Sequence, residues 1–244
     1  MLVKSTVKYI QSLGQKKFRD EEGLFMAEGP KIIKELLGAD NGSIKNLYAL
    51  PEWAEDNKQL TATIPVTIIT EIELGKISQL KTPNKVLAVL HQFDEPIEMI
   101  SKNNITLVLD GIQDPGNLGT IIRIADWFGV AQIICSNDTA DMYNTKVVQS
   151  TMGSIARVKM MYIQLEEWLS GQNDISIYAT TLDGKPIQQT TKIKESIIVF
   201  GNESKGISQE VLNYCTDKIT IPKKGKAESL NAGVAAGIVL SHLI

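Results

Sequence analysis

The sequence predicts an α/β protein whose carboxyl-terminal part is built on a mostly parallel sheet, covered by helices on both faces. Short apolar runs of the kind that form buried strands recur along the 244 residues, and segments with helical periodicity lie between them. Several of these runs end in turns rich in glycine, asparagine and acidic residues. Strands that alternate with helices pair in parallel, because each helix returns the chain to the start of the next strand.

Composition narrows the classes of protein. Hydrophobic residues make up 43% of the chain, which is enough for one large domain or two modest ones. The net charge of −3 argues against a globally basic nucleic-acid binder and is compatible with a local basic patch. Cys135 and Cys215 lack metal-binding spacing, and neither a signal peptide nor an apolar run of about 18 residues is visible. The sequence therefore predicts a cytoplasmic protein with no metal and no membrane anchor.

The first segment, residues 1–19, predicts a basic amphipathic helix. Apolar residues recur there at spacings of three and four, and no acidic residue precedes Asp20. The basic residues of the segment are Lys4, Lys8, Lys16, Lys17 and Arg19. Taken alone, such a run is typically a solvated helix face, and the alternative is a surface that binds RNA.

Residues 25–90 predict a small α/β unit. Residues 25–30 are extended, and Pro30 starts a helix over 31–37 that ends at Gly38. The other elements are strands at 44–50, 66–70 and 86–90 and a helical segment at 71–80. Acidic and polar residues at 92–104 predict a linker, which divides the chain into domains at 1–95 and 104–244.

The second domain opens with a strand, a loop and a helix. Residues 105–109 form an apolar run, and a turn rich in glycine, aspartate and proline follows at 110–117. Apolar residues recur at helical spacing after Asn117, the expected N-cap, and Gly129 ends the helix. Arg123 lies off this apolar stripe, so its guanidinium is expected to point toward the loop or a partner.

The rest of the chain continues the alternation of strands and helices. Strands are predicted at 131–135, 155–162, 175–180, 196–200 and 218–221, and helical segments at 144–151 and 166–169. Residues 230–244 predict a final helix that is apolar nearly all round and rich in glycine and alanine. Such a helix is buried on several sides, either within the fold or in a subunit interface.

Loops at 110–117, 201–206 and 221–231 each combine glycine with acidic, amide or basic residues directly after a predicted strand. Taken alone, the residues at 201–206 are typical of an ordinary turn. The lysines at 223–226 are typical of a solvated loop, and Ser229 is typical of a helix cap. Open parallel sheets bind ligands at the carboxyl ends of their strands. Three such loops in one domain therefore predict a functional site.

In these loops the chain resembles the SpoU/TrmH group of the SPOUT superfamily, RNA ribose 2'-O-methyltransferases that use S-adenosylmethionine. The order and spacing of three motifs carry the resemblance: Asn117-x-Gly119-x-x-x-Arg123-x-Ala125-x-x-Phe128-Gly129, Phe200-Gly201-Asn202-Glu203-x-x-Gly206-Ile207, and Ile221-Pro222 through Ser229-Leu230-Asn231. Residues 146–158 resemble the segment between motifs, and Phe25-x-Ala27-Glu28-Gly29 resembles the group's amino-terminal domain. Ser204 stands where many members have glycine.

The resemblance implies a trefoil-knotted parallel-sheet domain that dimerises, with a small L30e-like α/β domain before it that binds the RNA substrate. It implies methylation of a ribose 2'-hydroxyl, with ribosomal RNA favoured over transfer RNA because of the additional amino-terminal domain. A non-catalytic RNA-binding homologue is the further alternative. A nucleotide hydrolase is disfavoured, because the 110–119 loop has neither a Walker lysine nor a Gly-x-Gly-x-x-Gly pattern.

The resemblance also assigns the catalytic residues. Arg123 would act on the 2'-hydroxyl, and because a guanidinium has a pKa above about 12, two roles stay open. It either orients the hydroxyl and stabilises the alkoxide, or loses its proton in a site tuned by RNA phosphate. Asn117 would bond ribose, Arg123 or the loop, and Glu203 would orient Arg123 or groups of the partner subunit. Ser229 and Asn231 would line the site of methyl transfer.

Backbone groups of the knotted loops would hold the S-adenosylmethionine in this family. The positions implied here are Thr180, Gly201, Asn202, Ile221 and Leu230. Phosphate neutralisation would supply RNA affinity. The candidates are Lys4, Lys8, Lys16, Lys17 and Arg19 at the start of the chain and Lys223, Lys224 and Lys226 beside the site.

Overall fold

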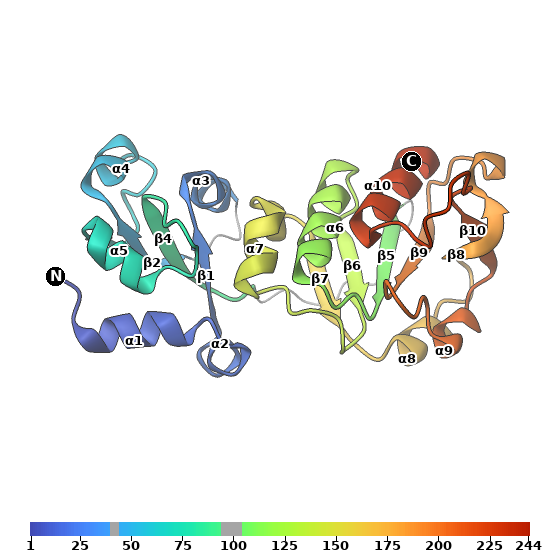
Figure 1. Cartoon of the computed structure of the whole chain (residues 1–244), viewed down its shortest axis with the longest axis horizontal. Helices are drawn as coiled ribbons and strands as arrows, with labels where there is room; N and C mark the ends of the chain where they lie inside the picture. The colour runs from blue at the N-terminus through green and yellow to red at the C-terminus, as the bar shows by residue number, and fades with distance from the viewer. Residues whose placement is uncertain (40–43, 94–103) are drawn as a thin grey trace. The chain divides into compact units, whose positions relative to one another are not determined.

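The computed structural model describes residues 1–39, 44–93 and 104–244, which form two compact units (Figure 1). The amino-terminal unit contains Met1–Asp94 and Asp141–Arg157, and the carboxyl-terminal unit contains Glu95–Ala140 and Val158–Ile244. Most of the expected linker lies outside the described residues. Sequence reasoning assigned Asp141–Arg157 to the second domain, whereas these residues pack with the first.

The amino-terminal unit is a four-stranded sheet with strand order β1-β4-β2-β3. Strand β4 pairs antiparallel with both β1 and β2, and β2 pairs parallel with β3. The strands are β1 (Leu24–Glu28), β2 (Ile44–Ala49), β3 (Val66–Ile68) and β4 (Val86–His91). The helices are α1 (Lys4–Ser12), α2 (Lys16–Glu22), α3 (Pro30–Gly38), α4 (Pro51–Asp56), α5 (Glu71–Ile77) and α7 (Thr145–Thr151), with a 3-10 turn, η1 (Ser154–Ala156). The sequence predicted all of the strands and missed α4.

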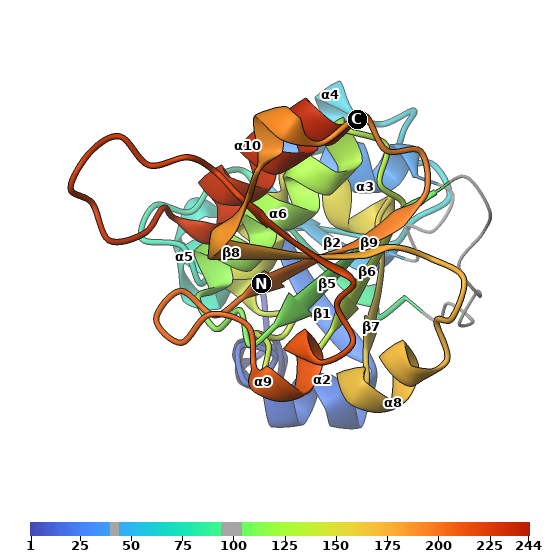
Figure 2. The same ribbon diagram turned by 90° about the vertical axis from the view of Figure 1, so that its right-hand side faces the viewer.

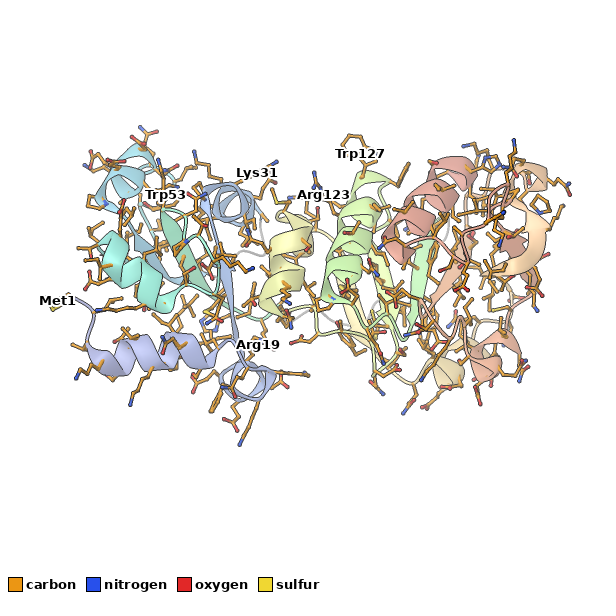
Figure 3. The ribbon with its side chains drawn as sticks, viewed as in Figure 1. Met1, Arg19, Lys31, Trp53, Arg123 and Trp127 are labelled. Carbon is orange, nitrogen blue, oxygen red and sulfur yellow. The ribbon has the colours of Figure 1, made fainter. Side chains whose placement is uncertain are left out.

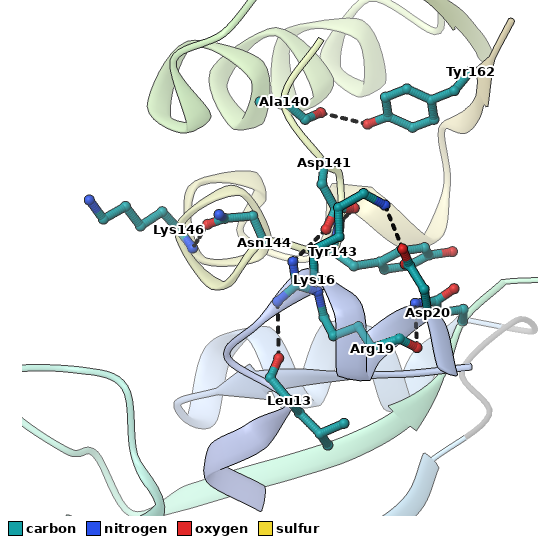
Figure 4. Close-up of polar contacts among 11 residues, drawn as sticks. Leu13, Lys16, Arg19, Asp20, Ala140, Asp141, Tyr143, Asn144, Lys146 and Tyr162 are labelled. Atoms are coloured by element: carbon teal, nitrogen blue, oxygen red, sulfur yellow. Dashed lines mark hydrogen bonds and ion pairs between the residues drawn. The ribbon is translucent and has the colours of Figure 1, made fainter. Parts of the chain in front are cut away.

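The basic segment at the start of the chain forms two helices, not the single helix that was expected. Helix α1 ends at Ser12, and the Arg19 side chain on α2 donates from Nη1 to the Leu13 carbonyl oxygen at 3.0 Å. The guanidinium is 2% exposed, and its Nη2 lies 2.5 Å from Asp141 Oδ2 (Figure 4). Arg19 is therefore an interior residue of this unit. Its predicted place on an RNA-binding surface is wrong.

A second buried charge lies at the end of β1. Glu28 is buried and accepts hydrogen bonds from the Ser78 hydroxyl and from the Gln79 backbone N–H, the latter at 2.8 Å. Burial raises the pKa of the Glu28 carboxyl, and the two donors oppose that shift. The carboxyl thus joins the end of α5 to the first strand.

The carboxyl-terminal unit is a six-stranded sheet with strand order β10-β8-β9-β5-β6-β7, parallel at every pairing. Helices α6 and α10 cover one face and α8 and α9 cover the other (Figure 2). The strands are β5 (Ile105–Asp110), β6 (Gln132–Cys135), β7 (Lys159–Tyr162), β8 (Ile177–Pro186), β9 (Ser196–Gly201) and β10 (Asp217–Thr220). The helices are α6 (Pro115–Trp127), α8 (Leu165–Ser170), α9 (Gln209–Leu212) and α10 (Ala232–Leu243), with a 3-10 turn, η2 (Ile187–Gln189). The doubly covered parallel sheet confirms the predicted fold class, and the knot stays a prediction.

Two helix starts differ in detail from the sequence prediction. Helix α6 begins at Pro115 with Asp114 as N-cap, whose Oδ1 accepts from the Asn117 N–H at 2.8 Å. Asn117 therefore lies within the first turn, and its side chain is available for other contacts. Helix α10 begins at Ala232, and its cap is Asn231, not Ser229. None of the helices among the described residues has the length and apolar character needed to span a membrane.

Candidate functional site

The loops that follow β5 and β9 lie together because these strands are neighbours in register, with Asp110 opposite Gly201. Two hydrogen bonds join the 202–208 segment to the end of β5. Asn202 Nδ2 donates to the Gly111 carbonyl oxygen at 2.7 Å, and the Ser208 N–H donates to Asp110 Oδ2 at 2.7 Å. The 202–208 loop is thus held at both ends by the end of β5.

The loop after β10 reaches the same place. Asn231 Nδ2 donates to Asn117 Oδ1 at 2.6 Å, and Asn117 Nδ2 donates to Glu203 Oε1 at 2.5 Å. A carboxylate can only accept, so the Asn117 amide must present its nitrogen to Glu203 and its oxygen to Asn231. Each of the three loops contributes one residue to this Asn231–Asn117–Glu203 chain, which confirms that the three predicted loops converge.

Close backbone packing shapes the end of β9. A Cβ atom on Gly201 would lie 2.3 Å from the Gly206 carbonyl carbon, so only glycine fits. Asn202 and Gly206 exchange backbone hydrogen bonds of 3.0 and 2.9 Å across this turn. The end of β9 is therefore a tight turn whose backbone packs against itself, and glycine at 201 is what permits it.

The other expected catalytic residues are accessible. Arg123 is exposed on α6 (Figure 3), and Ser229 is exposed in the loop before α10. In the part of the chain that the structure describes, neither side chain has a hydrogen bond or an ion pair. The expected contact between Glu203 and Arg123 is not formed within this single chain, where the Glu203 carboxylate accepts from Asn117 instead.

Three of the residues assigned to cofactor binding lie on or directly after the neighbouring strands β8, β9 and β10. Opposite β10 the register shifts from Ala179 to Lys185 between consecutive residues, so the segment 180–184 leaves the ladder. Thr180 begins this excursion, and its hydroxyl donates to the Val199 carbonyl oxygen at 2.8 Å. Gly201 ends β9, and Ile221 directly follows β10.

The remaining two residues of that set differ from each other. Leu230 is exposed at the end of the loop before α10. The Asn202 side chain is occupied by its own loop, because Oδ1 accepts from the N–H groups of Ser204 and Lys205 at 2.9 and 3.1 Å while Nδ2 donates to Gly111. The side chain of Asn202 thus positions the loop. Its backbone N–H is donated to Gly206, so only the second lone pair of its carbonyl oxygen remains for a ligand.

The expected basic residues are mostly on the surface. Lys223, Lys224 and Lys226 are exposed in the loop between β10 and α10, and Lys4 and Lys8 are exposed on α1. Two others, Lys16 and Lys17, are exposed and pair with acidic residues one turn later, at 2.9 and 3.8 Å. Their net contribution to a positive surface is therefore smaller than the sequence suggested.

Two acidic residues of the site were missed by sequence reasoning. Asp114 caps α6, and the Asp-Pro step was a local signal for that role. Asp110 accepts from Ser208, a contact between residues far apart in the chain that only the folded sheet creates.

Comparison with known proteins identifies two regions. Residues 104–241 match the SpoU rRNA Methylase family, and residues 4–88 match the MRM3-like substrate binding domain. Over 240 residues the chain is 30% identical to 23S rRNA (guanosine(2553)-2'-O)-methyltransferase RlmP of Bacillus subtilis, covering 97% of this chain and 95% of the relative.

Solved structures resemble the whole chain. An AdoMet-bound rRNA methyltransferase from Sinorhizobium meliloti is 32% identical with a TM-score of 0.87, and the match covers 100% of this chain and 95% of that one. The SpoU methyltransferase AviRb from Streptomyces viridochromogenes has a TM-score of 0.85 at 22% identity, covering 99% of this chain and 97% of that one. At that identity the second comparison supports the fold alone.

Proposed function

The chain belongs to the SpoU rRNA Methylase family, and from this premise we infer that it transfers a methyl group from S-adenosylmethionine to a ribose 2'-hydroxyl of ribosomal RNA. The observation that carries the proposal is the Asn231–Asn117–Glu203 chain, which joins three distant loops at one point on the sheet edge. The relative from Bacillus subtilis, matched over nearly its full length, favours ribosomal over transfer RNA.

The strand ends fit an adenosyl cofactor. Gly201 ends β9 in a turn of closely packed backbone, and the excursion at 180–184 provides a second main-chain segment on the neighbouring strand. Leu182 in the 180–184 excursion and Leu230 in the loop before α10 are large exposed apolar side chains, and such side chains can cover a base. When bound, S-adenosylmethionine supplies an electrophilic methyl group on a sulfonium. The residues that would hold it are Thr180, Gly201, Ile221 and Leu230, with the backbone of Asn202.

Methyl transfer to a hydroxyl needs an oriented oxygen and a path for its proton. The ribose oxygen would take up the methyl group, the cofactor would leave as S-adenosylhomocysteine, and the hydroxyl proton would pass to water at the exposed site. The Arg123 guanidinium, exposed and without a partner among the described residues, supplies a planar fork that can orient the ribose and stabilise the alkoxide. Asn117 is fixed by Glu203 and Asn231, so it can present one geometry to the ribose.

RNA contacts would come from exposed lysines on both units. Lys223, Lys224 and Lys226 flank the site, and Lys4 and Lys8 lie on α1. Because Lys16 and Lys17 pair within α2, the loop after β10 is the stronger candidate for phosphate contact.

We further infer that the protein forms a homodimer through α6 and α10. These helices pack side by side, since Gly233 lies against Thr120 and Gly237 against Ile124. Their outer surfaces expose apolar side chains, with Trp127 84%, Val234 50% and Ile238 36% exposed. Exposed apolar surface of this kind marks an interaction site. Arg123 lies on the same helix as Trp127, so a second copy seated here would bring each Arg123 to the interface.

Replacing Ile238 with glutamate, together with Trp127→Glu, is expected to convert the dimer to monomer, because both changes would bury carboxylates in the interface. Sedimentation velocity at matched concentrations measures the change. Ile72→Glu is the control, since Ile72 is 74% exposed on α5 in the amino-terminal unit and lies outside the proposed interface. A double variant that stays dimeric, or a wild type that is monomeric, would reject this interface.

The proposed reaction is tested with purified protein, isotopically labelled S-adenosylmethionine, and separate ribosomal and transfer RNA fractions that lack modifications. We expect label in ribosomal RNA, recovered after alkaline hydrolysis as an uncleaved dinucleotide, because a methylated 2'-oxygen cannot attack the adjacent phosphate. Label in transfer RNA would assign the alternative substrate, and label on a base would overturn the proposed position. Absence of transfer to any RNA would favour a non-catalytic RNA-binding protein.

A further inference from the structure

The turn after β6, residues 136–140, contacts the candidate site from the side opposite to the 202–208 loop. Both flank Gly111, which has a φ of 71° at the end of β5. A Cβ on Gly111 would lie 3.3 Å from Asp138 Oδ2 and 3.7 Å from the Asn202 Cβ. The geometry of Gly111 therefore depends on the 136–140 turn as well as on Asn202.

Hydrogen bonds from the 136–140 turn hold the end of β5 at several points. The Ser136 and Ala140 N–H groups donate to the carbonyl oxygens of Leu109 and Ile112, each at 2.9 Å. Ser136 Oγ accepts from the Gly111 N–H at 2.8 Å. None of these residues belongs to the three motifs that identify the family.

The Ser136 hydroxyl has a fixed direction. It has one proton, which it donates to Asp138 Oδ1 at 2.6 Å, and it accepts from the Gly111 N–H at 2.8 Å. The Thr139 hydroxyl lies 3.0 Å from Ser136 Oγ and donates its own proton to the Leu109 carbonyl oxygen at 3.2 Å. Ser136 therefore supports the Gly111 N–H directly, and Asp138 sets the direction of its hydroxyl proton.

From Gly111 the contacts continue into the site. Its carbonyl oxygen accepts from Asn202 Nδ2 at 2.7 Å, and Asn202 Oδ1 accepts from the N–H groups of Ser204 and Lys205 in the turn that follows. Glu203 lies in that turn and accepts from Asn117. We propose that Ser136 is a positioning residue for methyl transfer, acting through Gly111 and Asn202 to hold Glu203 and Asn117. The kinetic part of this proposal rests on the proposed function.

Replacing Ser136 with alanine leaves the Gly111 N–H without its acceptor, so the supports of Asn202 and Glu203 loosen. In the full-length protein we expect kcat to fall about 10-fold while KM for RNA and Kd for S-adenosylmethionine stay within about 2-fold, because a displaced loop impairs alignment. Ser136→Thr retains the hydroxyl and is expected to restore most of the loss. The matched control is Ser170→Ala on α8, where the serine hydroxyl donates to the Glu167 carbonyl oxygen of its own helix.

Hydrogen exchange measured by mass spectrometry tests the same proposal without any activity. Ser136→Ala should speed exchange at least about 5-fold in peptides spanning residues 109–113 and 201–206, and leave the β1 peptide unchanged. If the wild type methylates no RNA, the proposed function fails, and exchange still decides the role of Ser136. The proposal is overturned if exchange at 201–206 is unchanged. It is also overturned if KM for RNA rises by as large a factor as kcat falls. If Ser136→Ala does not fold, Asp138→Ala removes the acceptor of the hydroxyl proton and must give the same pattern at lower amplitude.

Discussion

Replacing Arg123 with alanine is expected to lower kcat for methyl transfer at least about 100-fold, while affinity for S-adenosylmethionine changes by no more than a few-fold. Removing one group that stabilises charge in a transition state typically has an effect of this size. Arg123 is exposed on α6 and has no partner among the described residues, so the substitution removes no contact that supports the fold of the single chain. Single-turnover methylation and equilibrium cofactor binding separate the two quantities.

Two further variants show whether the effect of Arg123→Ala comes from the geometry of the guanidinium or from loss of a positive charge. Arg123→Lys keeps the charge and loses the planar fork, so an intermediate rate would indicate that geometry as well as charge is needed. Lys194→Ala removes an exposed cation elsewhere in the carboxyl-terminal unit and is expected to leave the rate unchanged. Sedimentation must show that the Arg123→Ala protein keeps the wild-type oligomeric state. Full turnover by Arg123→Ala would remove this residue from the mechanism.

Asp141→Ala is expected to destabilise the amino-terminal unit by about 3–5 kcal/mol, because it leaves the Arg19 guanidinium charged, buried and without its carboxylate. The Arg19 side chain is only 2% exposed, and among the described residues its Nε already has no hydrogen-bond partner. Within that part of the chain, the Leu13 carbonyl oxygen would remain its one acceptor. Thermal unfolding followed by a probe in this unit should show a decrease in Tm on the order of 10 °C.

The exposed pair on the same helix is the control for that experiment. Lys16 and Asp20 lie 2.9 Å apart with side chains 64% and 51% exposed, so Asp20→Ala should change stability by less than about 1 kcal/mol. The double variant Arg19→Met with Asp141→Leu is expected to recover much of the loss, since it buries no unpaired charge. An Asp141→Ala protein as stable as the Asp20→Ala protein would contradict a structural role for the buried pair.

The loops of the candidate site could be predicted from the sequence, because turn-forming and polar residues mark the ends of strands. The loops after β5, β9 and β10 each combine glycine with amide or charged residues, and the structure joins them through Asn117, Glu203 and Asn231. The hydrogen-bond partners of the side chains in the site could not be predicted from the sequence. Glu203 was expected to orient Arg123 or groups of a partner subunit. Within this chain it accepts from Asn117, a contact that depends on how two separate segments meet.

By itself, the sequence determined the alternation of strands and helices and the positions of the loops that carry polar residues. This information is local, since hydrophobic periodicity and turn chemistry act over a few residues. Tertiary structure alone decided the strand order β10-β8-β9-β5-β6-β7, the packing of residues 141–157 in the amino-terminal unit, and the burial of Arg19. The sequence around a basic residue does not show whether its side chain faces solvent or pairs with a carboxylate more than a hundred residues away. Packing between distant segments decides which of these two environments it has.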